Sequence, residues 1–197
     1  MGKLKKEFYL NKSVTEVAVS LLGKRLCTNV DGQLTVGKIV ETEAYSGRND
    51  KACHANNGRR TKRNEVMYAE GGLAYVYFCY GIHNMFNVVT NIVDQADAVL
   101  IRAVEPIVGI DVMMARRGLS KPNKVSSGPG NVCKALGIRL GHNQASLLAD
   151  EIWIEDGSLF ENSDVIAKPR VGVDYAGDDA LLLWRYYLKD NIWISKK

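Results

Sequence analysis

Asp31-Gly32 restricts the fold of this chain more than any other feature, because it marks a tight reversal between two strand-like runs. Arg25–Val30 precedes the pair and Gln33–Tyr45 follows it, and both runs are rich in apolar and β-branched residues. An Asp-Gly pair tolerates the positive φ angles of a two-residue hairpin turn. We therefore expect at least one antiparallel pair of strands, around which the rest of the chain must pack.

The remaining pattern mixes helices with strands. Ser13 and Glu16 have the spacing of a capping box, which predicts a helix that stops near Gly23. Further predicted elements are a strand at 73–90 broken near Gly81, a strand at 98–104, a helix from Glu105-Pro106 to about Gly118, a short helix from Gly128-Pro129-Gly130 through Gly137, strands at 152–155 and 165–173, and either helix or strand at 180–191. We interpret residues 1–197 as one α+β domain.

Composition excludes several classes of protein. No apolar run is long enough to span a bilayer, and no signal-peptide segment follows the charged start. The four cysteines are widely spaced, which argues against a zinc site and against a disulfide framework; they are Cys27, Cys53, Cys79 and Cys133. A reduced, cytoplasmic protein is therefore the expectation.

Charge is distributed unevenly along the chain, although the net charge is only +4. Residues 48–63 carry a net charge of +5, residues 112–139 one of +6, and residues 150–179 one of −7. Because a solvated surface usually mixes its signs, the two basic segments indicate a face that meets a polyanion. The alternative is unrelated surface loops, which weakens only if both segments share a face. The acidic segment has no role that follows from the sequence.

Three polar side chains stand out on strands. Glu41 and Glu43 share a face with Tyr45 if their strand is regular. Such a face is either wet, or it holds one carboxylate in a cleft, where an ionised carboxylate can act as a general base on water. Arg102 is a lone cation in an apolar run; it either faces water at a sheet edge or is buried against a carboxylate such as Glu43.

Three other segments suggest contacts with nucleic acid. The loop after Tyr45 combines His54 with basic and amide side chains that suit phosphate oxygens. Tyr80-Gly81 lies where an aromatic strand turns, so the ring either wedges into a base stack or belongs to ordinary strand packing. Residues 126–131 precede a helix and offer backbone amides to an anion, but they match neither a Walker loop nor a dinucleotide fingerprint.

Taken in order along nearly the whole chain, these residues resemble the alkyladenine (3-methyladenine) DNA glycosylase family, the type unrelated to helix-hairpin-helix glycosylases. Each motif is short, and the ordered set is what makes the resemblance specific. The matching segments are 40–45, His54, 59–64, 75–77, 80–81, Asn87, 100–106, 127–129 and 170–173.

The resemblance implies a monofunctional DNA glycosylase of base excision repair. Such an enzyme binds double-stranded DNA, flips out an alkylated or deaminated purine, and hydrolyses its N-glycosidic bond; the expected lesions are of the 3-methyladenine, hypoxanthine and ethenoadenine type. The implied fold is a single compact domain with a curved, mainly antiparallel sheet flanked by helices. We expect a monomer without metal or cofactor, cytoplasmic and nucleoid-associated in a bacterium or nuclear in a eukaryote.

The resemblance also implies roles for matching positions. Glu43 matches the general base, and Arg102 with a backbone carbonyl near Val171 matches the groups that position the attacking water. Tyr45, His54, Tyr77 and Asn87 match the base pocket, where Asn87 opposes the exocyclic amine of guanine. Tyr80 matches the side chain that fills the gap left by the flipped nucleotide. The expected contacts to the DNA backbone are Arg59, Arg60, Lys62, Arg63, Gly128 and Gly130.

Two other classes of function stay open at this point. A nucleic-acid-binding module without catalysis would use the tyrosines as stacking platforms and the basic segments as phosphate contacts. A phosphodiesterase or transferase would normally need a metal cluster or a nucleotide loop, and the chain has only three histidines. Residues 46–52 and the turn at Ile82-His83 depart from the family pattern, which leaves the lesion preference open. Whether Glu41 is structural or supports Glu43 is a separate open question.

Overall fold

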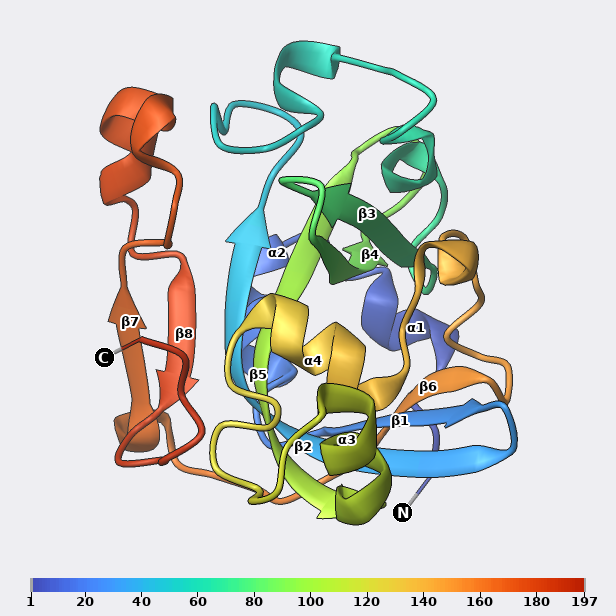
Figure 1. Ribbon diagram of the computed structural model, residues 1–197. Helices are drawn as coiled ribbons and strands as arrows, with labels where there is room; N and C mark the ends of the chain where they lie inside the picture. The colour runs from blue at the N-terminus through green and yellow to red at the C-terminus, as the bar shows by residue number, and fades with distance from the viewer. Residues whose placement is uncertain (1, 197) are drawn as a thin grey trace.

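The computed structural model describes residues 2–196, in which eight strands form one antiparallel sheet with short helices on its faces (Figure 1). The strand order is β3-β4-β5-β2-β1-β6, and β8 pairs with both β2 and β7. The strands are β1 (Arg25–Val30), β2 (Gln33–Tyr45), β3 (Ala74–Cys79), β4 (His83–Thr90), β5 (Asp97–Val108), β6 (Ile152–Glu155), β7 (Val165–Lys168) and β8 (Arg185–Leu188).

The helices are short. They are α1 (Lys6–Tyr9), α2 (Val14–Ser20), α3 (Ile110–Arg117) and α4 (Pro129–Leu136), with 3-10 helices at Asn56–Gly58, Glu65–Tyr68, Leu140–His142, Asn162–Asp164 and Asp174–Leu181. In Figure 1, α3 and α4 lie in front of the sheet and α2 lies behind β2 and β5. None of the helices within residues 2–196 combines the length and the apolar character that a membrane span requires.

The long strand β2 is the centre of the fold, because it pairs with β1, β5 and β8. The expected hairpin at Asp31-Gly32 is confirmed, with Val30 opposite Gln33. Side chains such as Ile39, Ile101 and Val104 are fully buried between the sheet and the helices. The expected fold class is confirmed as well: α+β, with a curved antiparallel sheet.

The capping residue Ser13 begins α2 as predicted, since its hydroxyl accepts a hydrogen bond from the backbone N–H of Glu16. The helix buries Val14 and Val17 in the core. The predicted break near Gly81 is also confirmed, because β3 and β4 form a hairpin that turns there. This hairpin carries several of the expected site residues.

The predicted helix start at Glu105-Pro106 is wrong, because β5 continues to Val108 and α3 begins only after Gly109. Pro106 pairs with Gly37 on β2, where a Cβ would lie 2.5 Å from a methyl group of Val104, so glycine lets the strands approach closely. Long-range strand pairing therefore overrides the local helix signal of Pro106. The predicted helix end at Gly118 is confirmed.

The predicted strand at 165–173 is too long, because β7 ends at Lys168 and Pro169 follows without an N–H to continue the ladder. Arg170 then turns inward and is buried. The ambiguous segment 180–191 contains β8, which forms a strand only where β2 and β7 flank it.

Candidate active site

A cavity of about 490 Å³ opens between the end of β2, the β3–β4 hairpin and the loop at 171–175. This volume suits a small-molecule cleft. Eight residues singled out from the sequence line it: Glu43, Tyr45, His54, Tyr77, Tyr80, Asn87, Arg102 and Val171. Arg63 and Pro129 line it too, so both basic segments of the sequence reach the same cavity. Within the part of the chain that the structure describes, no group of three His, Cys, Asp or Glu side chains is arranged to hold a metal ion.

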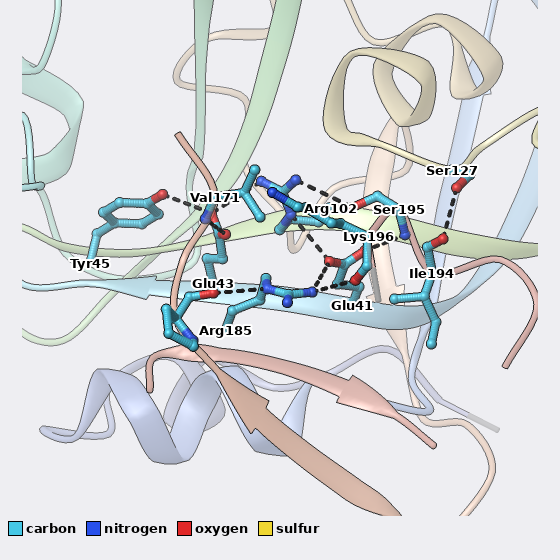
Figure 2. A network of polar contacts seen from close by, with 11 residues as sticks. Glu41, Glu43, Tyr45, Arg102, Ser127, Val171, Arg185, Ile194, Ser195 and Lys196 are labelled. Carbon is cyan, nitrogen blue, oxygen red and sulfur yellow. Dashed lines mark hydrogen bonds and ion pairs between the residues drawn. The ribbon is translucent and has the colours of Figure 1, made fainter. Parts of the chain in front are cut away.

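Glu43 is fully buried on β2 and is held by three donors (Figure 2). Its Oε1 accepts a hydrogen bond of 2.8 Å from the backbone N–H of Val171. Its Oε2 accepts one of 2.8 Å from the Tyr45 hydroxyl and one of 3.2 Å from Nη1 of Arg102. A buried carboxylate with these partners has a fixed orientation, which suits a group that must receive a proton at a defined place.

Arg102 lies on β5 with its guanidinium buried against two carboxylates. Besides Glu43, it binds Oε1 of Glu41 through Nε at 3.3 Å. Burial lowers the pKa of Arg102, but the charges of Glu43 and Glu41 raise it by more, so the net shift is upward and the group stays charged. The structure thus confirms the buried alternative for Arg102 and for the acidic face of β2; the exposed alternatives are wrong.

Aromatic side chains form the walls of the cavity. The rings of His54 and Tyr77 are 4.7 Å apart and meet edge to face, while Nδ1 of His54 is 2.8 Å from the Tyr75 hydroxyl. Burial, together with the charges of Arg63 and Arg59, lowers the pKa of His54 to about 4. The imidazole is therefore neutral at physiological pH.

Asn87 lies on β4 in the wall of the cavity and is only 4% exposed. Its Nδ2 donates a hydrogen bond of 3.1 Å to the backbone carbonyl of Tyr75 on the neighbouring strand. This contact fixes the amide, so a group that enters the cavity meets a rigid polar side chain there.

The tip of the β3–β4 hairpin, residues 78–82, carries exposed aromatic and aliphatic side chains, and Tyr80 among them lines the cavity. Tyr80 is 87% exposed and Ile82 is 68% exposed. Tyr80 has a φ of 51°, which is unusual for an aromatic residue, and Gly81 follows with a φ of 70°. The turn therefore presents the Tyr80 ring to solvent instead of packing it on the sheet.

The expected contacts to the DNA backbone lie in two places. Arg59, Lys62 and Arg63 are exposed on the 59–63 loop, and the guanidinium of Arg63 lies 4.8 Å from the centre of the Tyr77 ring. Arg60 is also exposed, but its guanidinium is paired with Glu65 at 2.6 Å and with Asp94 at 3.0 Å, so a phosphate would have to compete with two carboxylates for it.

Gly128 and Gly130 are at the start of α4. A Cβ on Gly130 would lie 2.7 Å from Cγ of His83. The close approach of α4 to the hairpin therefore requires this glycine, independently of any phosphate.

Arg170 is a site residue whose structural role sequence reasoning missed. Its guanidinium forms two hydrogen bonds with Asp50, at 2.6 and 2.8 Å. It also lies 4.8 Å from the centre of the Tyr45 ring and 5.2 Å from that of the Trp184 ring. It thereby supports the Tyr45 wall from behind and anchors the loop that carries Val171. The available signal in the sequence was its place directly before Val171, in the matching segment 170–173.

The partners of Glu41 could not be predicted from the sequence either. Its carboxylate binds Arg185 of β8 at 2.9 Å and the backbone N–H of Ser195 at 2.7 Å, in addition to Arg102 (Figure 2). Glu41, Glu43, Arg102, Arg185 and Ser195 form one connected cluster, hereafter the floor network.

Comparisons with known proteins agree on one family. The chain matches the family model described as methylpurine-DNA glycosylase over residues 7–192. A protein of Chlamydia felis named 3-methyladenine DNA glycosylase is 46% identical over 98% of this chain and 99% of its own length. Proteins of the same name from Clostridium perfringens and Methanocella arvoryzae are 43% and 45% identical, over 99% and 100% of this chain and 100% and 98% of their own lengths. The similarity therefore spans all residues of the cavity.

Proposed function

This chain belongs to the methylpurine-DNA glycosylase family, and on that premise we propose that its cavity receives a damaged purine flipped out of double-stranded DNA. The protein is a DNA glycosylase, a hydrolase of N-glycosidic bonds in DNA repair. We assign it 3-methyladenine as substrate, with hypoxanthine and ethenoadenine as further lesions, and a monofunctional mechanism carried out by a monomer.

The buried and triply bound carboxylate of Glu43 is the observation that carries this proposal. Glu43 accepts the proton of a water molecule as the water oxygen forms its bond to the anomeric carbon of the sugar. The bond between that carbon and the purine nitrogen breaks, and its electron pair leaves with the base. Arg102, bound to Glu43, and the backbone carbonyl of Val171, whose N–H is anchored on Glu43, hold the water in line.

The walls of the cavity select and orient the base. Tyr45 stacks on one face of the purine, and His54 with Tyr77 contacts the other. Because His54 is neutral, it does not repel the positive charge of an alkylated purine. Asn87, fixed by its bond to the Tyr75 carbonyl, clashes with the exocyclic amine of guanine and so discourages removal of the normal base.

The charge of the damaged base determines how readily it leaves the sugar. An alkylated purine with a positive charge leaves as a neutral base and needs no proton at departure. A neutral lesion such as hypoxanthine leaves as an anion unless a proton or hydrogen bonds stabilise it. We therefore expect 3-methyladenine to be released faster than hypoxanthine or ethenoadenine.

Capture of the flipped nucleotide is assigned to the hairpin tip and the basic segments. Tyr80 enters the duplex and fills the gap left by the extruded base. Extrusion costs a few kcal/mol, and stacking of a base on an aromatic ring returns about 1–3 kcal/mol, so two or three rings offset it. The backbone contacts are assigned to Arg59, Arg60, Lys62, Arg63 and the backbone at Gly128 and Gly130.

Single-turnover base release from matched duplexes tests the proposal. The duplexes differ only in one purine, which is 3-methyladenine, hypoxanthine, ethenoadenine or unmodified adenine. We expect release of 3-methyladenine at the highest rate and none of adenine. Tight binding of these duplexes without release of any lesion would contradict the proposal and would favour a binding module without catalysis.

A further inference from the structure

Arg102 is also contacted by residues 194–196, a segment to which no catalytic role has been assigned so far. The Ser195 hydroxyl lies 3.2 Å from Nη2 of Arg102, and the Ser195 backbone N–H donates to Oε2 of Glu41 at 2.7 Å. Figure 2 shows both contacts on the side of Arg102 that faces away from Tyr45. Ser195 thus touches the arginine directly and also the carboxylate that pairs with it.

The neighbours of Ser195 fasten this segment on both sides. The backbone carbonyl of Ile194 accepts a hydrogen bond of 3.1 Å from the Ser127 hydroxyl, next to the start of α4. The backbone carbonyl of Lys196 accepts one of 2.7 Å from Nη1 of Arg185. Residues 194–196 are therefore held by consecutive polar contacts: Ile194 with Ser127, and Ser195 and Lys196 with the floor network.

Glu41 connects the two arginines of the floor network. Its Oε1 accepts from Nε of Arg102 at 3.3 Å and from Nη1 of Arg185 at 2.9 Å. The side chains of Glu41 and Glu43 are 0% exposed, and those of Arg102 and Arg185 are 8% and 5% exposed. Two negative and two positive groups thus balance in a region with little water, where an unbalanced charge is costly.

The guanidinium of Arg102 is consequently fixed at three different nitrogens. Nη1 binds Glu43, Nε binds Glu41 and Nη2 binds the Ser195 hydroxyl. A planar group bound at one nitrogen can still rotate, whereas one bound at all three cannot. We propose that Ser195 and Glu41 are positioning residues, which hold Arg102 in the plane that serves Glu43 and the attacking water. This inference rests on the proposed function of Glu43 and Arg102.

A Ser195→Ala variant tests the proposal, because it removes only the hydroxyl and keeps the backbone N–H that binds Glu41. Single-turnover release of 3-methyladenine at saturating enzyme should fall about 10- to 100-fold, as expected when a reacting group is misplaced by a fraction of an ångström to one ångström. Affinity for a duplex with a tetrahydrofuran abasic site should stay within about twofold of wild type, since this probe reports capture without chemistry.

Matched variants separate positioning from simple destabilisation. Ser195→Thr keeps a hydroxyl and should restore most of the rate, while Ser120→Ala removes an exposed hydroxyl elsewhere and should behave as wild type. Glu41→Gln should also lose release more than affinity, but with a lower melting temperature, because both arginines lose their counter-charge.

Wild-type release by Ser195→Ala, or an equal loss of release and of abasic-site affinity, would overturn the positioning role. Absence of release by the wild-type protein would instead contradict the proposed function. The two failures are therefore distinguishable.

Discussion

The floor network and the hairpin tip border the same cavity, yet they differ in burial and in the way their side chains are held. The charged side chains of the floor network are at most 8% exposed, and each has at least two polar partners. At the tip, Tyr80 is 87% exposed and projects from a turn of positive φ angles. Proton transfer needs fixed groups in a dry site, whereas a ring that must enter a duplex has to begin outside the protein.

The difference predicts a separation of effects. Changes in the floor network should alter the rate of bond cleavage, and changes at the tip should alter the affinity for damaged DNA.

Glu43→Gln should abolish most base release, because the amide cannot take a proton from water. A loss of about 1000-fold or more in the single-turnover rate is expected from removal of a general base. Affinity for the lesion duplex should remain, since the amide keeps the shape of the carboxylate. Release at the wild-type rate would show that the general base is another residue.

Arg102→Ala should lower the single-turnover rate by about 100-fold, a size typical for the loss of one electrostatic partner in an active site. The reason is that Glu43 and the water lose a positively charged neighbour, while the proposed contacts to DNA lie elsewhere. The same titration should give a smaller change in affinity. An affinity loss larger than the rate loss would place Arg102 in DNA binding.

Tyr80→Ser should weaken binding of lesion duplexes by about 10- to 100-fold, which corresponds to one lost stacking contact. The pH dependence of release should keep its wild-type shape, because the floor network is untouched. Ile82→Ser is a suitable companion variant on the same turn. Unchanged affinity in Tyr80→Ser would remove this ring from the capture of the flipped state.

His54→Gln should change the pH dependence of stability. In the folded protein the pKa of His54 is lowered from 6.5 to about 4. Well above pH 6.5, His54 is neutral in both the folded and the unfolded protein. As the pH falls, His54 of the unfolded protein binds a proton first, so the free energy of unfolding decreases. The drop attributable to His54 should be about 2 kcal/mol at pH 5. Chemical denaturation at pH 7 and pH 5 should show a smaller difference in His54→Gln than in wild type; equal differences would contradict the shift.

The two regions also differ in how well the sequence predicts them. The hairpin at Asp31-Gly32 and the turn at Tyr80-Gly81 follow from local rules about positive φ angles, and both are confirmed. The partnership of Glu43 with Arg102 also follows from a physical rule, because a lone cation in an apolar strand needs a counter-charge. The fold class could also be predicted from local patterns, namely the apolar strand-like runs and the turn residues between them.

The rest of the floor network depends on contacts between distant positions. Glu41 meets Arg185 and Ser195 across 144 and 154 positions of sequence, and no local pattern indicates either pair. The course of β5 through Pro106 likewise depends on its pairing with Gly37. Arg170 meets Asp50 across 120 positions. Such residues are recognised as site residues only when the folded chain brings them together.

Affinity and release measured together for Glu43→Gln, Tyr80→Ser and the double variant test the separation most directly. All four proteins, wild type included, are titrated with the same 3-methyladenine duplex under single-turnover conditions. We predict that Glu43→Gln loses release at wild-type affinity, and that the double variant has the affinity of Tyr80→Ser and the release of Glu43→Gln. If Glu43→Gln instead loses affinity as Tyr80→Ser does, or releases the base at the wild-type rate, chemistry and capture are not divided between the floor network and the hairpin tip.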